Sequence, residues 1–213
     1  MARRYELRKR AERQAQTRRR IVEAAVELHA TVGPARTTVS AIAERAGVER
    51  KTFYRHFPDP DDIFAACSAH FRALNPPPDP QTWLAIARPR ERIHRALEQC
   101  YRYYRRNEQL LANVLRDREL GFPVGEGFLR HRAAARQTLA RGFDADTRRR
   151  RVLAAALELA LDFRTWQALA RGGLSDRQAV ELTSALVCAA LEPPCDRTAS
   201  PGSARRRRAT SRP

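Results

Sequence analysis

The chain has 213 residues, of which 43% are apolar, so it can form one or two small domains with packed cores, and a wholly disordered protein is excluded. Lys and Arg number 41 against 24 Asp and Glu, a net charge of +17. Nine basic residues lie within residues 1–20 and six within residues 193–213, so the two ends carry most of the excess. Basic ends favour a polyanionic partner, nucleic acid before membrane, although charged ends can also simply solvate a protein.

No apolar run approaches the 18 residues of a membrane span, and no apolar stretch follows the basic N-terminus as it would in a secretory signal. The cysteines, at positions 67, 100, 188 and 195, are far apart and form no CxxC pair. This spacing argues against a zinc module and a disulfide scaffold and suits a reducing compartment. We therefore expect a cytoplasmic protein without a metal or another cofactor.

The composition is dominated by Ala, Leu, Arg and Glu, and apolar residues recur at steps of three and four, which predicts an all-α fold. In chain order, helices are expected from about 17 to 32, from about 39 to 46, and over 50–56. The next is expected to start at Asp59 and Pro60. After a stiff Pro-rich linker at 76–80, helices are expected over 90–106, 107–116, from the glycine-rich loop to about 142, over 148–171, and from 176 to before Pro193.

Residues 36–57, RTTVSAIAERAGVERKTFYRHF, contain two short helices joined by a tight turn at Gly47. Val48, Phe53 and Phe57 can anchor the second helix to a core, which leaves a mainly cationic outer face. This spacing is typical of a DNA-binding helix-turn-helix. An ordinary pair of antiparallel helices with a solvated cationic face has the same spacing, so both interpretations remain open at this point.

Three stretches, RRRIVEAAVELHATVG, TTVSAIAERAGV and TFYRHFPD, give residues 17–64 an unbroken resemblance to the N-terminal domain of TetR-family transcriptional regulators. The rest of the chain is similar to that family only in length, helical pattern and linker position. The resemblance implies an N-terminal three-helix helix-turn-helix DNA-binding domain followed by a larger helical ligand-binding and dimerisation domain. The expected division is a basic arm at 1–16, the DNA-binding domain with a connecting helix at 17–75, the effector-binding and dimerisation domain at 76–192, and a basic, disordered tail at 193–213.

The resemblance also implies which residues contact DNA. Thr38, Ser40, Tyr54 and His56 are expected at phosphates, which set the register of the protein on the duplex. Base edges are expected to meet Arg50, Lys51 and Thr52, since Arg and Lys can pair with guanine O6 and N7.

The sequence departs from the family pattern at Glu49, where Ser is frequent, at Lys51, where Gly is common, and at Pro60, which replaces a phosphate-contacting Lys. The missing contact at Pro60 could be offset by the basic residues of the N-terminal arm, in a minor groove or along phosphates. The alternative is that the arm is a solvated tail. The basic run at 205–208 is open to the same two interpretations. The arm residues are Arg3, Arg4, Arg8, Lys9, Arg10 and Arg13.

A regulator of this family needs an effector site, and the resemblance places one after the linker. The sequence offers an aromatic and aliphatic set as its wall for a small hydrophobic or aromatic ligand. Each of these residues can equally belong to the plain core. The set is Phe71, Trp83, Leu97, Tyr101, Tyr104, Leu111, Val114, Leu115, Phe128, Phe163 and Trp166.

The last two helices are the best dimer seam, although part of the same apolar stripe must face its own subunit's core. The seam residues are Ala156, Leu159, Phe163, Leu182, Leu186, Val187 and Ala190.

Other classes of function fit less well. The five histidines form no metal-binding cluster, and no Gly-rich phosphate loop or nucleophile elbow is present, so we expect no enzyme. A non-specific basic nucleic-acid-binding protein would explain the Arg-rich ends but not the helix-turn-helix. Together with the helix-turn-helix, the resemblance therefore implies a homodimeric repressor that binds an operator in double-stranded DNA and is released by a small molecule.

Overall fold

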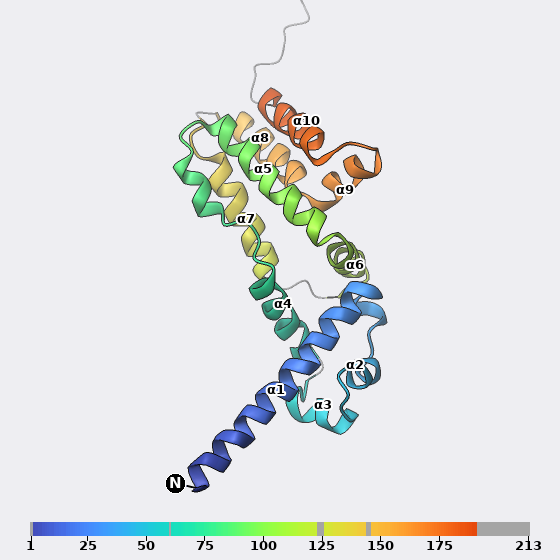
Figure 1. Cartoon of the computed structure of the whole chain (residues 1–213). Coiled ribbons are helices and arrows are strands. Elements are labelled where there is room, and N and C mark those ends of the chain that lie inside the picture. The colour runs from blue at the N-terminus through green and yellow to red at the C-terminus, as the bar shows by residue number, and fades with distance from the viewer. Residues whose placement is uncertain (1, 60, 123–125, 144–145, 191–213) are drawn as a thin grey trace, which may run out of the picture.

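The structure, a computed structural model, describes residues 2–59, 61–122, 126–143 and 146–190 (Figure 1). Within these ranges the chain forms ten α-helices, two short 3₁₀ helices and no strand, which confirms the all-α prediction. The molecule is elongated, with α1 to α4 at one end, a bundle of later helices at the other, and α6 where the two ends meet. No described helix has the length and hydrophobicity needed to cross a bilayer.

The N-terminal end consists of α1 (Ala2–Thr31), a 3₁₀ helix η1 (Pro34–Arg36), α2 (Val39–Arg45), α3 (Arg50–His56) and α4 (Asp62–Leu74). The second half of α1 packs on α2 and α4 and supplies four residues of a buried cluster. That cluster comprises Ile21, Val22, Ala24, Ala25, Ile42, Ala46, Phe53, Phe57, Ile63 and Cys67.

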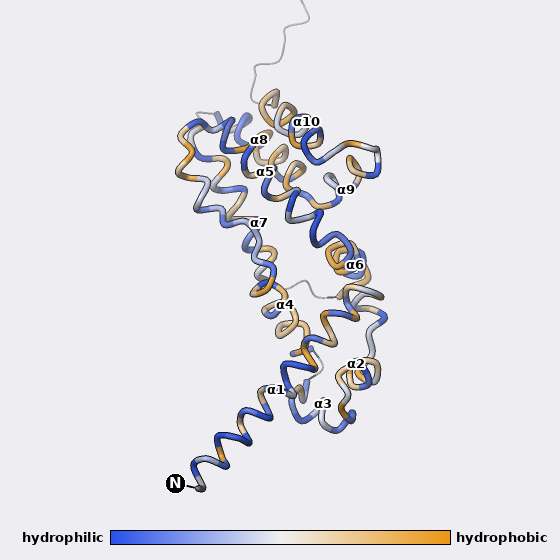
Figure 2. Tube along the Cα trace, viewed as in Figure 1, coloured by the Kyte–Doolittle hydropathy of each residue, from blue (hydrophilic) through white to orange (hydrophobic). Residues whose placement is uncertain are grey.

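Helix α1 begins about 15 residues earlier than predicted. Residues 2–16 carry no apolar stripe and are largely hydrophilic in Figure 2. They are nevertheless rich in strong helix formers, and Arg8 and Glu12 form an ion pair one turn apart, at 3.0 Å. Because the segment continues a helix that is already packed, it avoids the cost of nucleation. The expected arm is therefore a helical projection that leaves the body of the protein (Figure 1).

The other end contains the 3₁₀ helix η2 (Pro80–Ala85) and helices α5 (Pro89–Arg106), α6 (Glu108–Arg118), α7 (Glu126–Ala140), α8 (Thr147–Ala160), α9 (Phe163–Arg171) and α10 (Asp176–Ala189). Helix α5 is central and packs against α7, α9 and α10. Its buried face joins residues of the surrounding helices in a second core. Its members from α5 are Ile93, Ala96, Leu97, Cys100, Tyr101, Tyr103 and Tyr104.

The single long helix predicted over 148–171 is wrong, because the chain breaks into α8 and α9 at Leu161 and Asp162. Asp162 caps α9 by accepting a hydrogen bond from the Arg164 amide at 2.7 Å. Two tyrosine hydroxyls of α5 donate to carbonyls freed at the end of α8: Tyr101 to Ala160 at 2.9 Å and Tyr104 to Leu161 at 2.6 Å. These bonds satisfy buried carbonyls that would otherwise continue the helix.

The start predicted for the fourth helix is also wrong. Helix α4 begins at Asp62, and the Asp59 carboxylate accepts from the Asp61 amide at 2.9 Å, before the helix. Pro60 lies outside the described residues. Part of the Pro-rich linker is ordered as η2, where Asp79 caps the turn and Trp83 is buried.

Local capping interactions and glycines account for several helix ends. Thr38 caps α2 by accepting from the Ala41 amide at 3.1 Å, and Ser175 with Gln178 forms the capping box of α10. Gly33 and Gly47, which end α1 and make the turn after α2, have positive φ of 92° and 63°. The predicted disorder of the tail at 193–213 concerns residues outside the described ranges.

Candidate functional site

Helix α3 is held to the N-terminal core by two aromatic side chains. Phe53 and Phe57 are both 0% exposed, and their ring centroids lie 5.6 Å apart. One turn apart on the same face, they fix the rotation of the helix. Arg50, Lys51 and Tyr54 consequently lie on the exposed side. A short helix with a fixed apolar face and an exposed cationic face is able to enter a major groove.

The turn between α2 and α3 is fastened by cations from α1. The Arg20 guanidinium donates to the Ala46 carbonyl and to the Gly47 carbonyl, the latter at 3.3 Å. The Arg18 guanidinium lies over the Phe57 ring, 4.5 Å from its centroid. These contacts hold α3 at a set angle to α1.

The remaining predicted DNA-contact residues lie around α3. Thr38 and Ser40 are exposed at the start of α2, whereas Thr52 and His56 are partly buried. The Nε2 atom of His56 is buried and has no hydrogen-bond partner among the described residues. Burial, together with the nearby Arg55 and Arg18 charges, lowers the pKa of His56, so the ring favours its neutral form.

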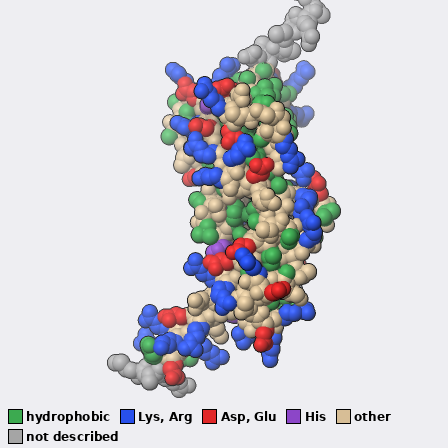
Figure 3. Space-filling model, turned by 45° about the vertical axis from the view of Figure 1, so that its right-hand side comes forward, with side chains coloured by type: hydrophobic (Ala, Val, Ile, Leu, Met, Phe, Trp, Pro, Cys, Tyr) green, Lys and Arg blue, Asp and Glu red, His purple; other side chains and the backbone are tan. Residues whose placement is uncertain are grey.

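The projecting part of α1 forms a second cationic surface, which we call the cationic rod and define as residues 2–16. Lys and Arg side chains gather on it in Figure 3. At 1.5 Å per residue it is about 22 Å long. Arg10 and Arg13 are fully available on its exposed surface, while the Lys9 amine packs over the Tyr5 ring at 4.7 Å.

An apolar cavity of about 120 Å³ lies where the two ends of the molecule meet. Its wall comes from α1, α4, the linker, α5, α6 and α7, so it touches both cores. The lining residues are Val26, His29, Cys67, Ser68, Phe71, Arg72, Pro77, Tyr103, Leu110, Leu111, Val114, Leu115, Gly127, Phe128 and His131. This lining includes five residues of the predicted wall, namely Phe71, Leu111, Val114, Leu115 and Phe128.

Six other residues of the predicted wall lie in the core of the upper bundle and do not line this cavity, so their placement is corrected. Their polar atoms are already engaged. Trp83 donates to Gln99 at 2.7 Å and Trp166 to Asp176 at 3.1 Å. The six are Trp83, Leu97, Tyr101, Tyr104, Phe163 and Trp166.

A polar contact that no sequence spacing signals ties α6 to the end of α1. We call Asn113, Arg116 and Asp117 the α6 clamp. The Asn113 amide donates to the Ala30 carbonyl at 2.7 Å, and Arg116 donates to the Val32 carbonyl at 3.1 Å. These bonds satisfy carbonyls that the last turn of α1 leaves free.

Asp117 is the buried member of the α6 clamp, only 1% exposed. Its carboxylate accepts from the Ala35 amide at 2.8 Å and from Arg116 at 2.7 Å. Burial alone would raise the pKa of Asp117, but these hydrogen bonds outweigh it and hold the pKa below its usual value. A Cβ on Gly33 would collide with Arg116 and Asp117, so this glycine is required for close approach as well as for its φ.

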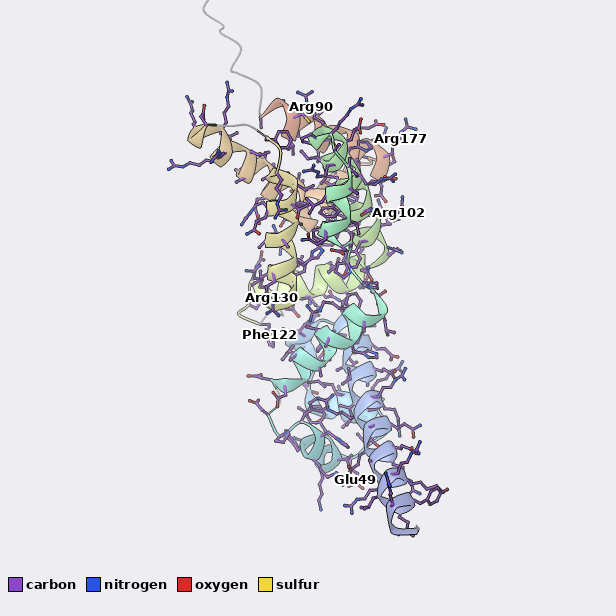
Figure 4. All side chains as sticks on the ribbon, turned by 90° about the vertical axis from the view of Figure 1, so that its left-hand side faces the viewer. Glu49, Arg90, Arg102, Phe122, Arg130 and Arg177 are labelled. Atoms are coloured by element: carbon purple, nitrogen blue, oxygen red, sulfur yellow. The ribbon has the colours of Figure 1, made fainter. Side chains whose placement is uncertain are left out.

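Further contacts close the junction on the other side. The ring of Phe122, labelled in Figure 4 where the two halves meet, lies 6.0 Å from that of Phe64 in α4. Phe64 in turn stacks on His29 of α1 at 5.5 Å. No group of three or more His, Cys, Asp or Glu that could hold a metal occurs in the described part of the chain.

Comparisons with known proteins agree with this geometry. Residues 21–67 match the family described as "Bacterial regulatory proteins, tetR family". A crystal structure of a TetR-like transcriptional regulator from Rhodococcus sp. RHA1 has a TM-score of 0.56 and 20% identity, covering 82% of this chain and 95% of that one. The crystal structure of the TetR family regulator PfmR from Thermus thermophilus has a TM-score of 0.54 and 22% identity, covering 81% of this chain and 94% of that one. A search of curated proteins gave no match. The structural matches establish the fold.

Proposed function

We propose that this chain, which has the N-terminal domain and the fold of a TetR-family transcriptional regulator, is a cytoplasmic repressor that binds a palindromic operator as a homodimer and is released by a small molecule. The observation that carries the proposal is the presentation of α3. Two buried phenylalanines fix its inner face, and Arg50, Lys51 and Tyr54 stand exposed on the outer one.

The positions around α3 support separate roles in binding. Arg50 and Lys51, in the first turn of α3, have the reach and the donors to pair with guanine. Thr38 and Ser40 at the start of α2 and Tyr54 in α3 are exposed and suit phosphate contacts, which orient the helix without reading sequence. Thr52, partly buried in α3, is proposed at a base edge, and His56, also partly buried, at a phosphate.

The proposed dimer surface consists of the exposed apolar faces of α8 and α10, two helices that pack side by side. Leu159, Leu182 and Leu186 are 60%, 42% and 55% exposed, an arrangement that favours burial against a second copy. Phe163 and Val187, also predicted for the seam, are buried within their own subunit and belong to its core.

The cavity is the proposed effector site because it lies between the two ends of the molecule. Val26 and His29 in its wall belong to α1, the helix that carries the DNA-binding core, while Leu111 and Val114 belong to α6. A ligand that binds more tightly to one orientation of α1 relative to α6 than to another shifts the population toward the orientation it prefers. In a dimer bound to DNA the two copies of α3 lie about 34 Å apart, and this distance would change with the orientation of α1.

Selection of bound fragments from a random DNA pool, repeated at two salt concentrations, tests the proposal. A palindromic consensus retained at higher salt is expected, with a preference over random DNA of about 10³-fold or more. The absence of any consensus, with binding governed by salt alone, would instead support the non-specific nucleic-acid-binding alternative.

Replacing Lys51 with alanine is expected to relax the preference at one base position and to weaken binding to the selected operator about 10- to 100-fold, because a base contact carries the specificity. Tyr54→Ala serves as the contrast and should weaken binding to all sequences alike. Repeating the selection with each variant separates the two effects. If Lys51→Ala leaves both the consensus and the affinity unchanged, Lys51 does not contact a base.

Deleting residues 1–13 is expected to lower affinity for operator and random DNA equally, by about tenfold at low salt, if the cationic rod neutralises roughly two or three phosphates. The double variant Arg10→Gln with Arg13→Gln should give part of this loss while keeping the helix. Arg150→Gln with Arg151→Gln, at the far end of the molecule, is the matched control. The measurement is the slope of the logarithm of the binding constant against the logarithm of the salt concentration. If this slope is the same for all the proteins, the cationic rod lies in solvent and does not contact phosphates.

A further inference from the structure

We propose that the cavity binds a small amphipathic organic anion, with an apolar body about the size of one aromatic ring and a carboxylate at Arg72. This inference rests on the proposed function, since it names the chemistry of the effector which that function requires. It combines four observations: the apolar wall, the sign of its only fixed charge, the seating of that charge on a glycine, and a buried histidine without a hydrogen-bond partner.

The wall selects an apolar body. Phe71 and Phe128, from α4 and α7, offer ring faces, and the leucines and Val114 of α6 supply aliphatic surface. The volume of about 120 Å³ compares with roughly 150 Å³ for an engineered apolar cavity that binds benzene. One ring, or a short acyl chain of similar size, fills such a space.

The charge of the lining selects the sign of the head group. Among the lining residues that the structure describes, Arg72 is the only permanently charged side chain, and none is Asp or Glu. Its guanidinium donates within its own helix, to the Ser68 carbonyl at 3.3 Å, and makes no ion pair with an acidic residue in the described part of the chain. A cationic ligand would meet this charge without compensation, whereas a carboxylate would pair with it.

The Arg72 guanidinium packs against the backbone of Gly127. The guanidinium lies so close to the Gly127 backbone that an added Cβ would overlap it. Gly127 is in the first turn of α7, a 15-residue helix that starts at Glu126, where free amides and the helix dipole favour negative charge. The glycine thus brings a cation to the positive end of a helix, at the edge of an apolar cavity. An anionic group placed there interacts favourably with both.

A buried polar side chain on the α1 side of the cavity provides the independent indication of a ligand. His29 is 5% exposed and lines the cavity, and its ring makes no hydrogen bond to any described residue. Burial lowers the pKa of His29 to about 4, against the opposing charge of Asp117, so the ring is neutral near pH 7. It therefore offers one donor and one acceptor to a polar group of the ligand.

The tyrosine and the second histidine of the wall complete the polar groups. Burial raises the pKa of Tyr103, although Arg72 and Arg106 act in the opposite direction, so its hydroxyl stays a donor. The Nε2 atom of His131 donates to the Pro78 carbonyl at 2.7 Å and thereby holds the linker against α7. Neither adds a negative charge that would reverse the preference.

The test uses three probes of one shape and different charge: benzoate, benzamide and benzylamine. Their dissociation constants for the full-length protein are measured by ligand-observed NMR, which detects weak binding. Benzoate is expected to bind at least about tenfold more tightly than benzamide, since a charge-assisted hydrogen bond is added, and benzylamine is expected to bind least.

Three variants and one control separate the effect of the Arg72 charge from the effect of its position. Arg72→Met should reduce benzoate affinity to that of benzamide, and Arg72→Lys should restore part of the difference. Gly127→Ala keeps every charge but displaces the guanidinium, so it should also lower benzoate affinity. Arg118→Met, which removes an exposed cation of α6 outside the cavity, is the control and should change nothing. A thermal melt of each variant reports whether it is folded.

The proposal is overturned if benzamide or benzylamine binds as tightly as benzoate, if Arg72→Met retains the preference for benzoate, or if none of the three probes binds. The proposed function is judged separately, because selection of an operator from random DNA uses no ligand. A palindromic consensus with no preference for benzoate would refute only the ligand class, whereas a missing consensus would refute the function.

Discussion

Replacing Asp117 with alanine is expected to lower the free energy of unfolding by about 3 kcal/mol. The change removes a buried carboxylate that accepts from Arg116 and leaves the Ala35 amide of the α1–η1 junction without its acceptor. Asp117→Asn retains an acceptor for the amide but loses the charge, so a smaller loss of about 1 kcal/mol is expected. Urea denaturation followed by circular dichroism measures both.

The control for Asp117 is Glu181→Ala, which breaks an exposed ion pair with Arg177 one turn away in α10. Such a pair contributes less than about 1 kcal/mol. If Asp117→Ala were no more destabilising than Glu181→Ala, the α6 clamp would contribute nothing measurable to the junction.

Lowering the pH from 6.5 to 4 is expected to cost the folded protein up to about 3 kcal/mol through His29 alone. The pKa of this histidine falls from 6.5 to about 4 on folding because the ring is buried, and each unit corresponds to about 1.4 kcal/mol. Between these values the unfolded chain binds more protons than the folded one, so stability rises with pH up to about 6.5. Above 6.5 this contribution is constant.

The measurement is the free energy of unfolding in urea between pH 4 and pH 8. His29→Gln should remove most of the slope, and His94→Gln, at an exposed position of α5, should leave it intact. A smaller slope of the same sign is expected to remain from His56, whose pKa is also lowered by burial. Asp117 titrates in a separate window, below the usual carboxyl range, since its pKa is held down in the fold. A full slope in His29→Gln would contradict the assignment to His29.

The helices with an apolar stripe and a capping residue could be predicted from the sequence. Thr38, Gly47 and Ser175 mark ends that depend on local chemistry alone, so α2, α3 and the start of α10 follow from a few neighbouring residues. The beginning of α1 could not be predicted in this way. Residues 2–16 have no stripe, and their helix depends on propensity and on continuity with a packed segment.

The break between α8 and α9 escaped prediction because its cause lies elsewhere in the chain. Tyr101 and Tyr104, about 60 residues earlier in sequence, satisfy the carbonyls at the break. The residues predicted for the wall of an effector site coincide only in part with the lining of the cavity, for a similar reason. Aromatic residues of α5 and α9 meet one another in the core, whereas the cavity draws on α1 and α4, and its polar groups, His29 and Arg72, carry no signal in sequence spacing.

Helix α1 runs without a break from the cationic rod to the junction with α6, so a tilt at one end moves the other. Its 30 residues extend over about 45 Å, from the tip of the cationic rod to the turn gripped by α6. A tilt of roughly 5° about the gripped end would swing the far tip by about 4 Å over that length. Because Arg18 and Arg20 of α1 hold α3 in place, a tilt of α1 moves α3 as well. In the proposed function, a single-ring ligand in the cavity beside this end of α1 would therefore displace α3 by a distance on the ångström scale.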